Sequence, residues 1–374
     1  MIYLDNNATT KLDPQALAEM LPFFTEQYAN AAATHVYGLM ATDALENARQ
    51  QVADLIHATP NEIVFTSGSS EAISLAINGI SALKKHSNPH IITVQTEHKA
   101  VLNTCEYLEK QGVEVTYLPV QSDGILDENI FKNAFKPNTV LACVMLANNE
   151  TGVLQDIQKL ATITHQNSAL FMTDATQAIG KIPVDVAALD IDLMPMAAHK
   201  FHGPKGVGAL FVKKGIQLEP LIHGGNQERG RRSGTSNIPG VVGMGVAASI
   251  LTKNGLNTVE IKQNRDFLEL ELLKIEGTKL NGNSENRLPN TTNICFEGCD
   301  SAAMMLALGQ IAVSNGSACT AATILPSHVL MAMGLSEADA FASLRFSLSR
   351  FTTWQEIEET ALSVRRVVKQ LRAR

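Results

Sequence analysis

The chain has 374 residues, of which 45% are hydrophobic, 18% are charged and 5% are aromatic, and its formal net charge is -7. This profile is typical of a compact α/β enzyme with a large core, and it argues against a disordered, fibrous or nucleic-acid-binding chain. No apolar run approaches membrane-spanning length, and the first ten residues lack a basic and an apolar region, so we expect neither a membrane segment nor a signal peptide. The five cysteines show neither disulfide nor metal-ligand spacing, which predicts no metal site and a reducing, cytoplasmic location.

From the amino terminus, two helical patterns come first, and strand-like runs then alternate with further helical patterns. A short helix is predicted over 14–24, behind the N-cap residue Asp13 and with Pro14 at its first position, and a longer one over 38–57. Strands are predicted at 62–66, 91–94, 114–118, 140–146, 170–173, 191–196 and 208–212. The segments that suit crossover helices are 71–85, 100–111 and 156–166. This alternation predicts an α/β fold whose mostly parallel, seven-stranded sheet lies between helices.

The pattern changes after about Gly255. Helices are predicted over 259–275 and 301–308 and from 355 onward, with strands at 278–280, 292–296 and 343–347. We interpret this part as a smaller α+β domain that the first dozen residues join. The predicted division is 13–255 for the large domain, and 1–12 with 256–374 for the small one.

Polar residues follow the predicted strands, where an open parallel sheet binds its ligands. Ser69 and Ser70 open the helix after the first strand, and its backbone N–H groups with these hydroxyls make an anion cradle, although an ordinary N-cap is the commoner meaning of such a turn. His98 follows the second strand, where it would equally serve as a helix cap. Asn149 lies in a polar loop after the fourth strand.

The fifth and sixth strands end in the most informative residues. Asp174 and Gln177 follow the fifth strand, and an acid at the end of a buried strand must be paired or hydrogen-bonded. His199 and Lys200 end the sixth strand, before the breaker pair of Gly203 and Pro204. A lysine at the rim of a buried sheet loses hydration, so its pKa falls toward the range of a free amine, whereas most single lysines are solvated.

Pyridoxal phosphate needs this set of groups. Lys200 would bind its aldehyde as a Schiff base, Asp174 would keep the ring nitrogen protonated, and His98 would stack on the ring. Gln177 would donate to the phenolic oxygen. The residues available to the phosphate are Ser69, Ser70 and His199.

Segments along the whole chain resemble those of the cysteine desulfurases, pyridoxal phosphate enzymes of fold type I that are related to the class V aminotransferases. They include YLDNNATT, FTSGSSE, TEHKAVL, ANNETGV, DATQAIGK, HKFHGPKGVGAL, GGNQERGRRSGT, SNGSACTAA and LRFSLSRFTT. The resemblance implies that Lys200 is the Schiff-base lysine, that His98 also shuttles protons, and that Asn149 lies near the cofactor. It gives Arg345 to the substrate α-carboxylate, a task that suits a planar guanidinium. Without it, Arg345 would be interpreted as a plain edge-strand arginine.

The resemblance further implies a homodimer with shared active sites, because Thr235 would reach the cofactor phosphate of the neighbouring subunit. It makes Cys319 the nucleophile, on the longer mobile loop of the branch that supplies sulfur for iron–sulfur cluster assembly. A lone cysteine is more often a buried apolar filler, but the small polar neighbours of Cys319 favour an exposed thiol.

The implied reaction removes sulfur from L-cysteine, gives L-alanine, and leaves a persulfide on Cys319 for acceptors such as an iron–sulfur scaffold, with tRNA thiolation as another destination. The alternatives are a selenocysteine lyase, another enzyme like the class V aminotransferases, and a non-enzymatic scaffold. Two departures bear on the site. Ala197 stands where the family has a phosphate-binding serine, which removes a contact of about 1 kcal/mol. Asn30 is followed by three alanines where the family has Asn-Pro-Ser-Ser.

Overall fold

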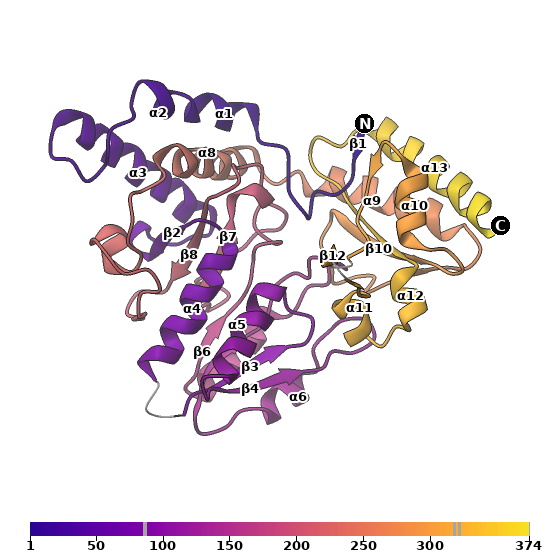
Figure 1. Cartoon of the computed structure of the whole chain (residues 1–374), viewed down its shortest axis with the longest axis horizontal. Coiled ribbons are helices and arrows are strands. Elements are labelled where there is room, and N and C mark those ends of the chain that lie inside the picture. Colours follow the sequence, from indigo (N-terminus) through magenta and orange to yellow (C-terminus); the bar gives the residue numbers. More distant parts are fainter. Residues whose placement is uncertain (85–87, 317–318, 321–322, 374) are drawn as a thin grey trace.

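The central sheet of the computed structural model has seven strands (Figure 1). They are β2 (Ile63–Thr66), β3 (His90–Val94), β4 (Glu114–Leu118), β5 (Thr139–Cys143), β6 (Leu170–Met172), β7 (Leu193–Ala197) and β8 (Gly208–Val212). Their order is β2-β8-β7-β6-β5-β3-β4, and only β8 runs antiparallel to its neighbours. The predicted mostly parallel sheet is thus confirmed. The structure describes residues 1–84, 88–316, 319–320 and 323–373.

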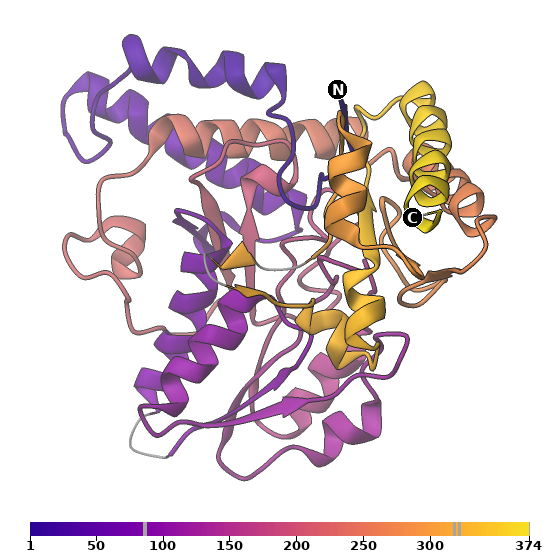
Figure 2. The same cartoon turned by 45° about the vertical axis from the view of Figure 1, so that its right-hand side comes forward.

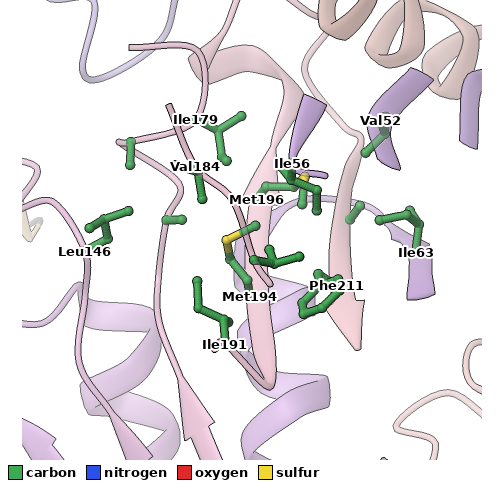
Figure 3. Packing of buried hydrophobic residues seen from close by; sticks show 14 of the residues in the cluster. Val52, Ile56, Ile63, Leu146, Ile179, Val184, Ile191, Met194, Met196 and Phe211 are labelled. Atoms are coloured by element: carbon green, nitrogen blue, oxygen red, sulfur yellow. The ribbon is translucent and has the colours of Figure 1, made fainter. Parts of the chain in front are cut away.

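Helices cover both faces of this sheet. They are α1 (Pro14–Met20), α2 (Pro22–Thr25), α3 (Val36–Leu55), α4 (Ser69–Leu83), α5 (Lys99–Glu109), α6 (Glu128–Asn133), α7 (Ile157–Gln166) and α8 (Ile238–Asn254). Successive strand residues point to opposite faces, and both faces are buried here: Phe171 and Met194 pack with α3, α7 and α8, whereas Met172 and Leu193 pack with α4 and α5. Figure 3 shows the first of these clusters.

The short helix α6 was not predicted, and two larger differences from the predicted helices have a clear cause. The helix expected over 14–24 is divided between α1 and α2, because Pro22 has no N–H to continue the helical hydrogen bonds. Helix α8 was not predicted, because it is apolar around its whole circumference and presents no polar stripe. Its glycines let it pack closely, since a Cβ on Gly243 would overlap Met20 and one on Gly245 would lie 2.7 Å from the Cα of Ala48.

A second core lies beside the sheet, and both chain ends lie on that side of the molecule (Figures 1 and 2). Its strands are β1 (Ile2–Tyr3), β9 (Thr278–Leu280), β10 (Thr291–Phe296), β11 (Ile311–Ala312) and β14 (Ser343–Ser347). Its helices are α9 (Thr258–Leu273), α10 (Ser301–Leu308) and α13 (Trp354–Arg372). Ile2 and Leu4 pack in this core with residues from Leu268 onward. The domain boundaries at 12/13 and 255/256 stay a prediction.

Short elements lie between β11 and β14 in the chain. They are β12 (Cys319–Thr320), β13 (Thr323–Ile324), α11 (His328–Ala332) and α12 (Glu337–Phe341). Strands β12 and β13 pair antiparallel and form a hairpin. None of the helices in the described part of the chain is long and apolar enough to cross a lipid bilayer.

Candidate active site

A cavity of about 230 Å³ lies where the central strands of the sheet end. It is lined by Ser69, Ser70, His98, Met145, Ala147, Asn149, Asp174, Thr176, Gln177, His199 and Lys200. All of the predicted cofactor-binding residues except Thr235 line this cavity. The carboxyl ends of parallel strands share one edge of the sheet, and this is why residues that lie far apart in the sequence meet here.

Lys200 ends the short 3₁₀ helix η3 (Ala198–Lys200), directly after β7. Its Nζ donates to the backbone carbonyl oxygens of Asn7 at 2.6 Å and Ala8 at 2.9 Å. Burial lowers the pKa of Lys200 to about 8, and the nearby charge of Arg345 adds to this effect, while neighbouring carboxylates oppose it. The free amine is therefore available close to neutral pH, as addition to an aldehyde requires.

Two other groups face the cavity from neighbouring loops. Asp174 is buried, and its Oδ1 accepts the backbone N–H of Thr176 at 2.9 Å. His98 caps α5, with its Nδ1 accepting the backbone N–H of Ala100 at 3.1 Å, and its ring lines the cavity as well. His98 can therefore cap the helix and face the cofactor cavity at the same time. Mainly because of burial, the pKa of His98 is lower than that of a free histidine, so its ring is neutral at pH 7.

At the predicted anion cradle, the start of helix α4 has no capping side chain. Helix α4 begins at Ser69 behind Gly68, which offers no side chain to the first N–H groups. The ordinary N-cap interpretation of the serines is therefore wrong. A Cβ on Gly208 would lie 2.7 Å from the Cα of Gly68, so only glycine lets β8 approach the cradle this closely. Burial lowers the pKa of His199 to about 4, so this cavity residue is a neutral ligand.

Orphaned polar atoms test whether a cofactor fits this cavity. Asn149 Oδ1 and Thr176 Oγ1 are buried without a hydrogen-bond partner in the described part of the chain, and both residues line the cavity. Such atoms are costly unless a ligand or water satisfies them. A buried amine, a buried carboxylate and a helix N-terminus fit the aldehyde, the ring nitrogen and the phosphate of pyridoxal phosphate.

Asn7 is a site residue that the sequence analysis missed. Its backbone carbonyl accepts from both Lys200 Nζ and Gln177 Nε2, the latter at 2.9 Å. Its side-chain Oδ1 accepts from Lys181 Nζ at 3.0 Å, and Lys181 also donates to Gln177 Oε1 at 2.5 Å. Asn7 and Lys181 lie in two segments quoted for the family resemblance, YLDNNATT and DATQAIGK, but no role was predicted for either residue. The only local signal for Asn7 is a polar pair in a segment with no helix or strand pattern.

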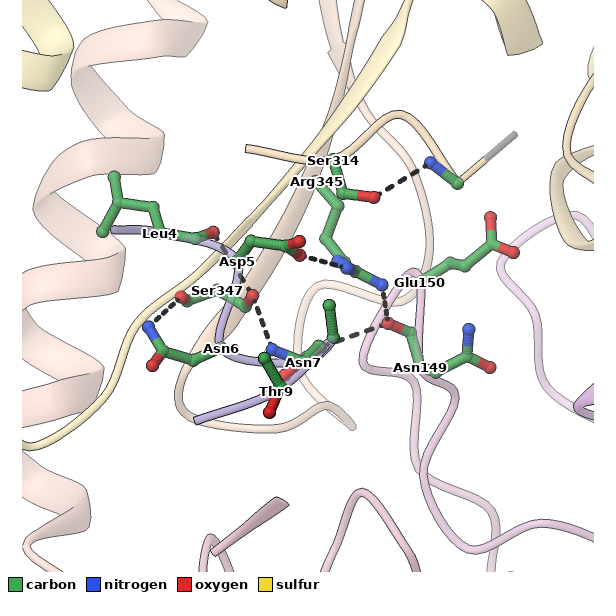
Figure 4. Close-up of polar contacts among 12 residues, drawn as sticks. Leu4, Asp5, Asn6, Asn7, Thr9, Asn149, Glu150, Ser314, Arg345 and Ser347 are labelled. Atoms are coloured by element: carbon green, nitrogen blue, oxygen red, sulfur yellow. Dashed lines mark hydrogen bonds and ion pairs between the residues drawn. The ribbon is translucent and has the colours of Figure 1, made fainter. Parts of the chain in front are cut away.

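Arg345 lies on β14, outside the cavity wall but buried, with 5% of its surface exposed. Figure 4 shows its guanidinium between two chain segments: Nη1 donates to the backbone oxygen of Asn149 at 2.8 Å, and Nη2 pairs with Asp5 Oδ1 at 2.5 Å. Its Nε has no partner among the described residues. β14 is indeed an edge strand of its three-stranded sheet, but the arginine on it is buried and ion-paired and not a plain solvated one.

The two remaining predicted residues lie elsewhere. Thr235 lines a separate cavity of about 110 Å³, together with Ser67 and Arg232. Cys319 lies in β12, and its side chain falls outside the described structure. The four other cysteines are buried free thiols.

A lysine, an acid and a helix N-terminus that line one cavity, at the carboxyl edge of a mostly parallel sheet, are typical of one class of proteins: pyridoxal phosphate enzymes of fold type I. The chain belongs to the class-V aminotransferase family, whose model matches residues 2–360.

Known proteins resemble the chain over its full length. A cysteine desulfurase IscS from Haemophilus influenzae strain PittGG is 46% identical over 378 residues, which cover 100% of this chain and 94% of that protein. A solved NifS-like protein superposes with a TM-score of 0.93 at 35% identity and covers 99% of both chains. The structure of SspA in complex with cysteine has a TM-score of 0.85 at 36% identity, covering 94% of this chain and 100% of that one.

Proposed function

We propose that this chain is a pyridoxal-phosphate-dependent cysteine desulfurase, which converts L-cysteine to L-alanine and retains the sulfur as a persulfide on Cys319. The observation that carries the proposal is the meeting of Lys200, Asp174 and His98 around one cavity, in a chain that matches cysteine desulfurases from end to end. An aminotransferase would need the first three residues but not a cysteine nucleophile.

The cavity residues have distinct tasks. Pyridoxal phosphate, when bound, withdraws electrons from the substrate Cα. Lys200 holds the aldehyde and, with a pKa of about 8, moves the Cα proton at neutral pH. Asp174 would pair with the protonated ring nitrogen of the bound cofactor, and His98, as a neutral imidazole, would lie against the ring and relay protons. Ser69 and Ser70 bind the phosphate with the α4 N-terminus, which also compensates for the missing hydroxyl at position 197.

Substrate recognition and sulfur removal use residues from β14 and β12. Arg345 binds the α-carboxylate of L-cysteine, and the unpartnered Nε offers one donor for this. The Cys319 thiolate attacks the substrate sulfur, so that an S–S bond forms while the Cβ–S bond breaks. The electron pair returns to Cβ, which takes up a proton and leaves as the methyl group of alanine.

The assembly and the sulfur acceptor are further parts of the proposal. We infer a homodimer, because Thr235 lies in a cavity apart from Lys200 and would meet a cofactor phosphate only across a subunit boundary. The persulfide would pass to an acceptor such as an iron–sulfur scaffold or a tRNA-thiolation protein. A reducing cytoplasm suits a chain whose described cysteines are free thiols.

The test is turnover of L-cysteine with a thiol reductant, in which sulfide and alanine are measured together. We expect equal amounts from the parent chain and none from Cys319→Ser, which keeps the yellow colour of the bound cofactor. Cys295→Ser is the matched control, because it removes a thiol from β10 without touching the cavity. Sulfide release by Cys319→Ser would disprove the nucleophile. A keto acid in place of alanine would indicate an aminotransferase, and a strong preference for L-selenocysteine would indicate a selenocysteine lyase.

A further inference from the structure

Glu150 is a buried acid that the proposed reaction does not use. It follows Asn149 in the loop after β5, and its side chain points away from that neighbour in Figure 4. Only 3% of its surface is exposed, and burial raises the pKa of its carboxyl to about 7, although Ser327, Arg345 and Lys99 oppose the rise. Burying a carboxyl with so few partners is unfavourable, so a gain elsewhere must offset it.

The carboxyl of Glu150 touches both segments that flank the β12–β13 hairpin. Ser327 lies three residues after β13, and its Oγ donates to Glu150 Oε2 at 2.5 Å. Gly316 lies three residues before β12, with φ +67°, and a Cβ at this position would overlap the same oxygen. One carboxylate oxygen therefore lies between the chain entering the hairpin and the chain leaving it.

The same loop also contacts the substrate side of the site. The backbone oxygen of Asn149 accepts from Arg345 Nη1 at 2.8 Å. Arg345 is bridged in turn to Ser314, whose carbonyl accepts the Arg345 backbone N–H at 2.6 Å. The chain entering the hairpin is thus hydrogen-bonded to Arg345 at residue 314 and packs against the Glu150 carboxyl at residue 316. Asn149 and Glu150 are consecutive residues. They therefore link Arg345, which is predicted to bind the substrate α-carboxylate, with the chain segments at the base of the hairpin.

We propose that Glu150 is a positioning residue for Cys319: its carboxyl binds Ser327 at one end of the hairpin that carries this cysteine, packs against Gly316 at the other end, and so keeps both ends in place beside Arg345. The inference deepens the proposed function and rests on it for the role of Cys319. Glu150 itself touches neither the cavity nor the reacting atoms. Replacing Glu150 by a residue without a carboxyl group loosens the base of the hairpin and leaves the chemistry at Lys200 intact.

The test separates the chemistry at Cys319 from that at Lys200, in the full-length holoenzyme. Exchange of the Cα proton of L-alanine with D₂O, followed by NMR, needs Lys200 and the cofactor but no cysteine. Alkylation of Cys319 by iodoacetamide, followed by mass spectrometry of its peptide, needs no turnover. In Glu150→Ala, we expect the kcat for sulfide release to fall by about tenfold or more, with Cα exchange and KM within about twofold of the parent. We also expect the alkylation rate of Cys319 in Glu150→Ala to differ from that in the parent by about threefold or more.

Two serine variants supply the matched comparison. Ser327→Ala removes the hydroxyl that binds Glu150, and with it the N-cap of the five-residue helix α11. Ser336→Ala removes the N-cap of the five-residue helix α12 and a hydroxyl contact to Asp339, but touches neither Glu150 nor the hairpin. We expect Ser327→Ala to follow Glu150→Ala, and Ser336→Ala to follow the parent.

A conservative variant and the contrary outcomes complete the design. Glu150→Gln retains an oxygen that can accept from Ser327, so its kcat should lie between those of the parent and Glu150→Ala. Equal alkylation rates of Cys319 in the parent, Glu150→Ala and Ser336→Ala would overturn the inference. So would a parallel loss of Cα exchange and sulfide release, since a general structural defect affects both. A parent that makes no alanine refutes the proposed function instead, and the alkylation rates still decide the role of Glu150.

Discussion

Replacement of Asn7 by alanine tests whether this side chain joins the two cores at the site. Nδ2 of Asn7 donates to the backbone oxygen of Asn149 at 3.1 Å and to Thr291 Oγ1 at 3.0 Å. Its Oδ1 accepts from Lys181 Nζ at 3.0 Å and from Asn290 Nδ2 at 3.2 Å. Asn7 is 1% exposed, so water replaces none of these bonds in the folded chain.

The four bonds set the magnitude of the effect. A hydrogen bond contributes about 1 kcal/mol net to stability, and a stranded buried group costs more. Each partner of Asn7 keeps another bond, such as Lys181 to Gln177 and Asn290 to the backbone oxygen of Leu348. We therefore expect Asn7→Ala to lower the free energy of unfolding by about 3 kcal/mol, which is roughly a hundredfold in the unfolding equilibrium.

Urea unfolding followed by circular dichroism measures this loss. Asn167→Ala is the control, because Asn167 is exposed and its amide makes one bond of 2.9 Å to the carbonyl of Ile163 in the preceding helix, worth about 1 kcal/mol or less. Sulfide production by Asn7→Ala should fall as well, since the carbonyl that holds Lys200 belongs to the loosened residue. A loss of stability no larger than that of Asn167→Ala would refute the view of Asn7 as a junction.

Further predictions concern the amine of Lys200, the buried ion pair of Arg49 with Glu228, and the predicted contact of Arg345 with the substrate carboxylate. The rate at which the cofactor-free chain takes up pyridoxal phosphate should rise with pH up to about 8 and then level off, because burial lowers the pKa of Lys200 and only the neutral amine reacts. Stopped-flow absorbance measures this rate, and a rate that still rises up to pH 10 would contradict the prediction. Glu228→Ala removes one of the two carboxylates that pair with the buried Arg49 guanidinium, which donates to Glu228 at 2.6 and 2.9 Å and keeps its ion pair with Glu46. It should cost about 2–3 kcal/mol in urea unfolding, and a loss under about 1 kcal/mol would show that the pair with Glu228 is dispensable. Arg345→Lys should raise the KM for L-cysteine about tenfold or more without changing the cofactor colour, because an ammonium lacks the planar donors of a guanidinium; an unchanged KM would remove Arg345 from the substrate.

The local elements were largely predictable because each depends on a pattern within a few residues. The strands at 114–118, 208–212 and 343–347 and the helix at 301–308 have the predicted bounds. Helix α8 shows where this reasoning fails, since its burial on every side comes from packing against α1 and α3 and leaves no period in the sequence. The division of the helix at Pro22 was readable from the sequence in principle, because proline lacks the backbone donor.

The cofactor residues were also predictable, since a general rule of sheet topology places the ends of parallel strands together. Lys200, Asp174 and His98 needed only their position after a strand to be grouped, and they line one cavity. His98 shows that the alternatives weighed for one residue need not exclude each other, because it caps a helix with one ring nitrogen and lines the cavity at the same time.

By itself, the sequence determined the fold class, the edge of the sheet that carries the site, and the chemistry of its residues. Only the tertiary structure decided which polar groups from distant segments pair: Asp5 with Arg345, Glu150 with Ser327, and the Asn7 carbonyl with Lys200. These partners lie 340, 177 and 193 residues apart in the chain. No periodicity links positions so far apart, because their contact arises only when the two cores pack against each other and exclude water from the polar groups between them.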